Sequence, residues 1–364
     1  TNYGYNLAGD LTGITYSDTT PAVAFTYNRL GQQLTVTDAV GTRTFGYSDK
    51  FQLTSETING IYNKVISRSY DALGRSSGMN IGTEYGVGYG YDNLGRFSTV
   101  TSGTDVFTYG YLPNSNLVSS IQYPASISVT KSYESNRDLV TSIENKYGTT
   151  TISKYDYSND DLGRRTAMGK SGTAFSQADT IAYGYNDRSE VTSAVAQNQA
   201  TYNYGYSLDA LGNRITSAST ETGTSVTRTY TANQLNQYTA IDNPAATPTY
   251  DFDGNMTGDG GSWDYTWDAE NRMASAANGS QTLQFKYDYL SRRVEKKVLD
   301  GGTETKKERF VYSGYKHIER LNALDSNIIV QKFVWLGQGM LSMADSNGVY
   351  YYIRDANKNA SELL

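Results

Sequence analysis

The feature that most constrains this chain is a repeat of about 21 residues that continues through much of its length. A tyrosine followed by a turn-like segment recurs at intervals of 22, 20, 23, 21, 20 and 22 residues. The first members of the series are Tyr5, Tyr27, Tyr47, Tyr70, Tyr91, Tyr111 and Tyr133. A fixed period of this length is typical of repeat architectures, in which each unit packs against its neighbours along the chain.

The best copies of the repeat share an Asp, a Gly three residues later, and then an Arg. An Asp carboxylate caps backbone N–H groups in a tight turn, and Gly accepts the positive φ that such turns require. Turns of this kind join antiparallel strands into hairpins. The Arg is expected to bridge to the Asp of its own or a neighbouring turn. The predicted structural motif residues are Tyr70, Asp71, Gly74, Arg75, Tyr91, Asp92, Gly95, Arg96, Asp209, Gly212 and Arg214.

The segments between the turns alternate as strands do. In residues 87–91 the large side chains Val87, Tyr89 and Tyr91 share one face, and glycines occupy the other. Gly between aromatic residues in a strand marks curvature or the close approach of another backbone. We therefore predict an all-β fold, in which antiparallel hairpins of about 21 residues form a curved, spiralling sheet. A β-propeller is the alternative, although its blades need a period of ~40–50 residues.

Composition removes several classes of function. Among 364 residues there are 33 Tyr and 35 Gly but no Cys, which excludes disulfides, zinc–cysteine sites and cysteine nucleophiles. A pI near 5.0 and a net charge of −6 argue against a nucleic-acid partner. The sequence has no apolar run of the ~18 residues that a membrane-spanning helix needs.

Little in the sequence points to catalysis, and we predict no catalytic residue, metal or cofactor. His317 is the only histidine, and we expect it on a strand facing solvent. The acidic run from Asp251 to Asn255 lacks EF-hand spacing and occupies the turn position of a repeat. The basic hairpin at residues 296–309 carries interleaved Glu residues, which favours a solvated face over an anion site.

The repeated motif resembles the YD repeats that occur in Rhs proteins, in the BC shell of Tc toxins and in teneurins. Further stretches resemble variants of that repeat, at residues 233–238, 250–255 and 287–294, and residues 310–359 resemble the approach to the Rhs-associated core. The resemblance implies a β-strip that spirals into a hollow shell, which in many members encloses a C-terminal toxin. Lys358 stands where the family has Gly, and the family's Asp-Pro-x-Gly motif is absent, so self-cleavage is not implied.

We therefore expect a YD-repeat hairpin array at residues 1–290 and further hairpins resembling the Rhs core region at 291–364. The expected function is structural and not enzymatic: a segment of a longer, secreted or surface-delivered bacterial protein that encapsulates a C-terminal cargo. Expected partners are the rest of the same polypeptide or a capping domain, and an enclosed toxin domain. Seventeen hairpins are expected at this period.

Two alternatives to containment stay open from the sequence. One is a cell-surface adhesion or carbohydrate-binding module, in which exposed tyrosines such as Tyr89 and Tyr109 stack on glycans. The other is an enzyme, for which the sequence offers only generic acidic residues. A toxin domain encoded downstream favours containment, whereas a wall anchor favours adhesion.

Overall fold

A computed structural model describes residues 1–221, 223–337 and 339–364. The described residues form 34 strands and one short 3-10 helix, η1 (Ala200–Tyr202). Each strand pairs antiparallel with the next, except between β22 and β23, where one sheet ends and a second begins. The predicted all-β fold of repeated antiparallel hairpins is confirmed, and 34 strands correspond to the seventeen hairpins expected.

The first sheet contains β1 (Asn2–Tyr5), β2 (Leu11–Thr15), β3 (Val23–Tyr27), β4 (Gln33–Asp38), β5 (Gly41–Tyr47), β6 (Leu53–Gly60), β7 (Lys64–Tyr70), β8 (Ser76–Ile81), β9 (Tyr85–Tyr91), β10 (Phe97–Ser102), β11 (Asp105–Tyr111), β12 (Val118–Gln122), β13 (Ile127–Tyr133), β14 (Val140–Tyr147), β15 (Thr150–Asn159), β16 (Arg165–Ser171), β17 (Asp179–Tyr185), β18 (Val191–Ala196), β19 (Tyr204–Leu208), β20 (Arg214–Glu221), β21 (Thr224–Ala232) and β22 (Tyr238–Ile241). The second contains β23 (Thr249–Tyr250), β24 (Met256–Gly258), β25 (Asp264–Trp267), β26 (Met273–Asn278), β27 (Gln281–Tyr287), β28 (Arg293–Asp300), β29 (Thr303–Ser313), β30 (Lys316–Asn322), β31 (Ile328–Leu336), β32 (Gly339–Asp345), β33 (Gly348–Arg354) and β34 (Ala360–Leu363).

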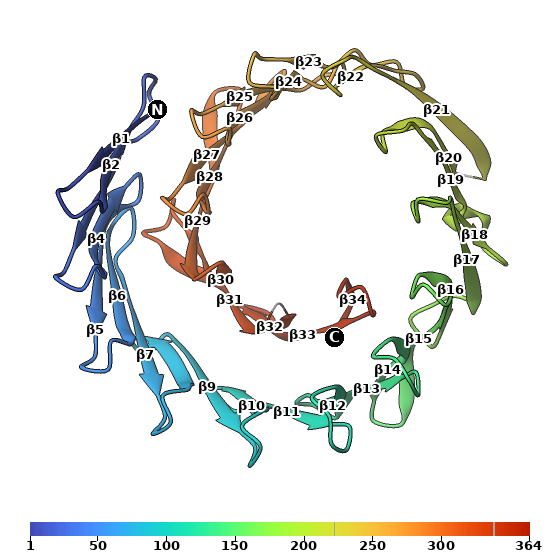
Figure 1. Ribbon diagram of the computed structural model, residues 1–364, viewed down its shortest axis with the longest axis horizontal. Coiled ribbons are helices and arrows are strands. Elements are labelled where there is room, and N and C mark those ends of the chain that lie inside the picture. The colour runs from blue at the N-terminus through green and yellow to red at the C-terminus, as the bar shows by residue number, and fades with distance from the viewer. Residues whose placement is uncertain (222, 338) are drawn as a thin grey trace.

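The strip of hairpins curves into a ring and continues past its own start (Figure 1). The strands β27–β33 lie inside the arc formed by β4–β11, so the chain makes more than one turn of a spiral. The predicted boundary at residue 290 falls inside the second sheet and remains a prediction. None of the described residues forms a helix with the length and hydropathy needed to cross a membrane.

Contacts between the outer and inner turns repeat at a nearly constant separation in the sequence. The hydroxyl of Tyr62 donates to the Phe310 carbonyl, and that of Tyr85 to the Phe333 carbonyl, each across 248 residues. One turn of the spiral therefore takes about twelve repeats. Nearer the C-terminus the separation falls, to 229 residues between Tyr123 and Tyr352. We call this contact between residues 20–165 and 268–364 the seam.

The main hydrophobic core of the molecule lies at the seam. It combines side chains of the outer turn, such as Ile66 and Phe107, with side chains of the inner turn, such as Ile318 and Ile353. Between Ala196 and Ala276, by contrast, the described residues include no buried Ala, Val, Ile, Leu, Met or aromatic side chain. Full burial of one large apolar side chain stabilises by ~1.5–3 kcal/mol. The overlap of the two turns thus supplies apolar burial that a single layer of hairpins lacks.

The glycines between tyrosines have a steric cause. A Cβ built on Gly90 would overlap the Thr99 hydroxyl of the paired strand, and Gly46, Gly110 and Gly184 face serine hydroxyls in the same way. Each of these glycines directly precedes a repeat tyrosine. At Gly46 and Tyr47, for example, the pairing of β5 with β6 shifts register between the two residues. The sequence led us to expect curvature or the approach of another backbone at these glycines, whereas the structure places a side-chain hydroxyl against each of them.

This packing predicts different outcomes for two glycines of the same strand. Gly90→Ala should destabilise the chain by about 1–3 kcal/mol, because Thr99 has to move. Gly86→Ala is the matched control, since no atom lies within 4 Å of the added Cβ. Urea unfolding of the two variants measures the difference, and equal stabilities would contradict the steric explanation.

Candidate functional site

The turn of each good repeat copy is closed by its own Asp and Arg. Asp71 Oδ1 accepts hydrogen bonds from the backbone N–H groups of Leu73 and Arg75, both at 2.9 Å. Its other oxygen accepts from Arg75 Nε at 2.7 Å, and Gly74 has φ +80°. Asp92, Gly95 and Arg96 repeat this geometry. Of the two bridges that the sequence left open, the structure shows the one within the turn.

The motif Arg also reaches the following repeat. The Arg75 guanidinium lies 4.0 Å from the ring centre of Tyr91, and that of Arg96 lies 4.2 Å from the ring centre of Tyr111. An Arg held over an aromatic ring is attracted by the negative face of that ring. The same stacking occurs in the pairs Arg164–Tyr185, Arg214–Tyr230, Arg272–Tyr287 and Arg292–Tyr312.

The repeat tyrosine in turn ties its hairpin to the one before it. The hydroxyl of Tyr91 donates to the Ser76 carbonyl at 2.8 Å, and that of Tyr70 donates to the Leu53 carbonyl at 2.8 Å. Equivalent bonds are made by Tyr27, Tyr47, Tyr111, Tyr133, Tyr185, Tyr250, Tyr287 and Tyr312. These units are thus linked to the preceding hairpin by a hydroxyl bond and, in the good copies, by an Arg over a ring.

The copy at residues 209–214 differs from the others. Asp209 accepts from the backbone and side chain of Asn213, and Arg214 lies over Tyr230 instead of pairing with Asp209. Gly212 keeps the positive φ, at +88°. The inserted Asn therefore takes over the role of closing the turn, while the Arg keeps its contact with the next repeat.

A buried ion network joins the two turns at the seam. Arg43 lies 2.8 Å from Asp38, 3.3 Å from Glu56 and 3.1 Å from Asp288 of the inner turn. Asp288 also pairs with Arg292 at 2.6 Å, within its own repeat turn. Burial by itself lowers the pKa of Arg43, but the facing carboxylates raise it above its usual value, so the guanidinium stays charged.

Sequence reasoning missed Arg43, although the sequence carries a signal for it. In β5 this residue is in phase with the buried Phe45, so a charge stands on the face of the strand that packs inward. A charge at such a position requires a partner. The partners at Asp38 and Glu56 are close in the sequence, whereas Asp288 is brought there only by the spiral.

Replacement of Arg43 tests how much the seam contributes. Arg43→Met leaves Asp38, Glu56 and Asp288 buried without their shared cation, and we expect a loss of about 3–5 kcal/mol. Arg188→Met is the control, because this Arg pairs with Glu190 on an exposed surface away from the seam. The free energy of unfolding of Arg188→Met should fall by much less. Urea unfolding, followed by tryptophan fluorescence, measures the stability of both variants. Similar losses of stability would argue against the idea that contacts at the seam hold the fold together.

His317 lies on β30, but the prediction that it faces solvent is wrong. Its ring packs against Phe310, Tyr312 and Phe333, with centroid distances of 5.2, 5.7 and 4.5 Å. Nε2–H donates to the Glu319 carbonyl at 2.9 Å. Burial lowers the pKa of His317 to about 4, so the ring is neutral at pH 7.

The lowered pKa makes stability dependent on pH. The unfolded chain takes up a proton on His317 near pH 6.5 and the folded chain only near pH 4, so this contribution is complete above pH 6.5 and is lost as the pH falls. We expect a decrease of about 2 kcal/mol between pH 7 and pH 5. His317→Gln should remove it. An unchanged slope in His317→Gln, measured by urea unfolding at each pH, would contradict this assignment.

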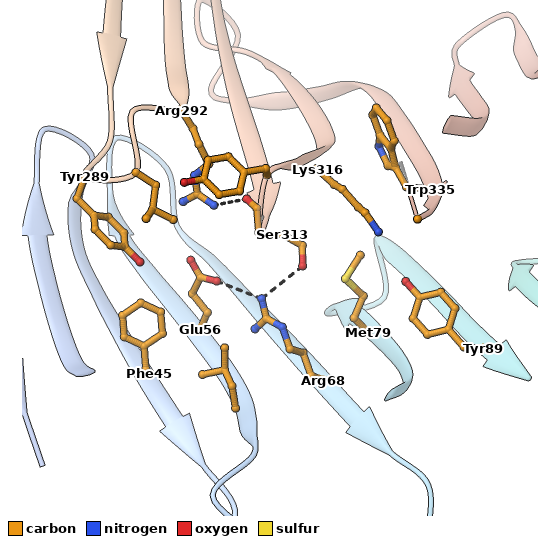
Figure 2. A pocket seen from close by; sticks show the side chains of 15 residues that line it. Phe45, Glu56, Arg68, Met79, Tyr89, Tyr289, Arg292, Ser313, Lys316 and Trp335 are labelled. Carbon is orange, nitrogen blue, oxygen red and sulfur yellow. Dashed lines mark hydrogen bonds and ion pairs between the residues drawn. The ribbon is translucent and has the colours of Figure 1, made fainter. Parts of the chain in front are cut away.

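A cavity of about 690 Å³ opens at the seam between β5–β9 and the inner turn (Figure 2). Arg68 crosses it, with Glu56 Oε2 at 3.2 Å and Ser313 Oγ at 3.4 Å. Tyr89 and Trp335 line it with their rings. Tyr89 and Tyr109 pack against the core, so the exposed tyrosine rows required for glycan stacking are not present at these positions.

The described residues contain no group of three or more His, Cys, Asp or Glu side chains arranged to hold a metal ion. Asp251 closes its own turn by accepting from Asp253 and Asn255. In the basic hairpin, Lys297 pairs with Glu304 at 2.8 Å and Arg309 with Glu295 at 2.8 Å. These residues therefore satisfy one another within turns and strand pairs.

Comparison with known proteins gives similarity at two levels. No protein-family model matches the chain. It is 29% identical over 154 residues to the tRNA3(Ser)-specific nuclease WapA of Bacillus spizizenii, and 34% identical over 96 residues to the tRNA nuclease WapA of Bacillus subtilis. These alignments cover 40% and 26% of this chain but only 6% and 4% of the relatives.

Among solved structures, the crystal structure of TcdB2-TccC3-TEV matches all of this chain, with a TM-score of 0.57 and 13% identity. The chain has the Rhs/YD-repeat shell fold. It spans 24% of the length of that larger chain. The resemblance seen in the repeat motif is thus confirmed in the YD-repeat fold, and the β-propeller alternative is excluded.

Proposed function

We propose that this YD-repeat chain is a wall segment of a hollow shell, which encloses a cargo domain of the same longer polypeptide. The proposal rests on the seam, because the contacts between the outer and inner turns, 248 residues apart at Tyr62 and Tyr85, join successive turns of the strip into one wall. The similarity to tRNA nucleases and to a chain of the Tc holotoxin pore of Photorhabdus luminescens supports a toxin as the cargo, and in this proposal the protein is delivered by secretion or at the cell surface. In this proposal the segment itself is structural and not enzymatic.

In such a wall the repeat motif has a mechanical role. The Asp–Arg pair fixes each turn, the Arg and the Tyr hydroxyl fix the position of the next hairpin, and the ion network fixes the next turn of the spiral. Each contact acts on a different length scale. Together they set a curvature that brings the strip back to the seam after about twelve repeats.

The seam can be tested in solution by cross-linking, because the chain has no native Cys. Arg165 of the outer turn donates to Asn357 of the inner turn at 2.5 Å on an exposed surface. The pair Arg165→Cys and Asn357→Cys should cross-link rapidly within one molecule with a short bismaleimide. The pair Leu235→Cys and Asn357→Cys is the control, because the exposed Leu235 lies in the turn between β21 and β22, across the ring from β34 (Figure 1), and it should cross-link far more slowly. Equal rates would overturn the spiral.

Containment is tested with the intact polypeptide that carries this segment. A protease should leave the enclosed region uncut while the wall is closed, and Arg43→Met, which weakens the seam, should expose it. Arg188→Met should leave the protection unchanged. Digestion at the same rate in all three proteins would contradict containment without contradicting the fold.

A further inference from the structure

The ladder of strands in the wall is interrupted at the joint between β22 and β23. All other strands that follow one another in the described chain are paired, whereas β22 ends the first sheet and β23 begins the second. The strands after this joint are also short, and β24 pairs with β25 only through Gly258 and Asp264. Backbone pairing along the described strip is therefore weakest between β22 and β25.

No second layer of wall supports this joint. The seam begins where the Ala269 N–H donates to the Thr20 hydroxyl at 3.0 Å, so the arc of residues 166–267 is one strip thick (Figure 1). Between residues 197 and 267, no large apolar side chain of the described residues is buried. Local opening costs least free energy where apolar contacts are few and backbone hydrogen bonds are lacking. Both conditions hold at the joint between β22 and β23.

The linker between the two strands stores chain length. Ile241 and Ala246 exchange two backbone hydrogen bonds, at 2.9 and 2.8 Å, and these bonds fold residues 242–245 into an exposed loop. When this pair breaks, the whole linker of residues 242–248 is free to extend. A chain of that length spans up to about 25 Å when it is extended. The two sheets can therefore move apart by this distance while every strand pair within each sheet is kept.

The side chains across the joint hold it closed only weakly. The Tyr250 hydroxyl donates to the Tyr238 carbonyl at 3.0 Å, as repeat tyrosines do elsewhere in the wall. Thr247 of the linker packs against Gly260, where an added Cβ would overlap the Thr247 backbone. At the turn before the joint, Gln237 stands at the position of the motif Arg. A neutral amide lacks the attraction of a guanidinium for the next tyrosine ring, so one of the two usual links is missing.

We propose that the joint between β22 and β23 is a lateral port in the wall, which opens when the two sheets separate and closes again on the Tyr250–Tyr238 bond. The length of the linker limits what passes. An α-helix with its side chains is about 10–12 Å wide, whereas a folded domain of about 100 residues is more than about 30 Å wide. The port therefore passes an unfolded chain or a single helix and retains a folded domain. Its use as an exit for cargo rests on the containment proposal, but the opening itself does not.

Hydrogen–deuterium exchange of the full chain, read by mass spectrometry, tests the opening. The backbone amides of β22–β25 should exchange at least about tenfold faster than those of β20 and β21, because local opening costs only part of the free energy of unfolding. β20 and β21 are the internal control, since they lie in the same thin arc but are joined by a continuous ladder. Equal exchange rates in the two regions would overturn the proposal.

A cross-link across the joint separates opening of the port from fraying of single strands. Leu235→Cys and Phe252→Cys lie on exposed turns at either side of the joint, and a short bismaleimide should join them. The cross-link should slow exchange in β22–β25 to the rate seen in β20 and β21. Leu73→Cys and Leu94→Cys, on exposed turns at either side of the paired strands β8 and β9, are the matched control. Their cross-link should leave exchange in β22–β25 unchanged, and an equal effect of both cross-links, or of neither, would overturn the port.

The intact polypeptide tests the role of the port as an exit. Three Gly-Ser units inserted after Ala245 lengthen the linker, so a protease should cut the enclosed region severalfold faster, and the cross-link between residues 235 and 252 should abolish this increase. The same insertion after Gly279, in an exposed turn between paired strands, should have no effect. Equal protection in all these proteins would overturn the exit. Rapid cutting already in the native polypeptide would contradict containment, whereas the port is decided by the exchange rates.

Discussion

The structure depends on the contact between successive turns of the spiral. In a single layer of hairpins both faces of the sheet are open to water. Backbone pairing between the strands therefore leaves most of the apolar side-chain surface exposed. Where the inner turn lies against the outer one, Ile66, Phe107 and Ile318 become fully buried. Where the strip is one layer thick, between residues 197 and 267, burial of this kind is absent from the described residues.

This dependence gives the curvature of the strip a thermodynamic importance. The seam forms only if every hairpin is rotated relative to the last by the amount that closes the ring after about twelve repeats. The Arg-over-Tyr contacts and the Tyr hydroxyl bonds act locally, yet a small error in each would accumulate around the ring. We infer that the motif recurs because the distant contact, from Tyr62 to Phe310, requires it.

The sequence predicted the hairpins, their number and the residues of the turns, because these follow from short-range rules. Asp71 and Gly74 satisfy a turn whatever surrounds them. The seam could not be predicted in this way, since the partners of Arg43 and Tyr62 lie about 248 residues away and depend on curvature. The prediction that His317 faces solvent was wrong for the same reason. The strand that carries His317 could be predicted, but the aromatic rings that cover its side chain come from neighbouring strands.

The same reasoning explains why the tyrosines are numerous. A tyrosine ring provides apolar area for the next repeat or for the seam, and its hydroxyl satisfies a backbone carbonyl that a thin wall would otherwise expose. Tyr91 does both through Arg75 and Ser76. Leucine would supply the area without the bond. A wall with little conventional core therefore favours a residue that packs and donates at once.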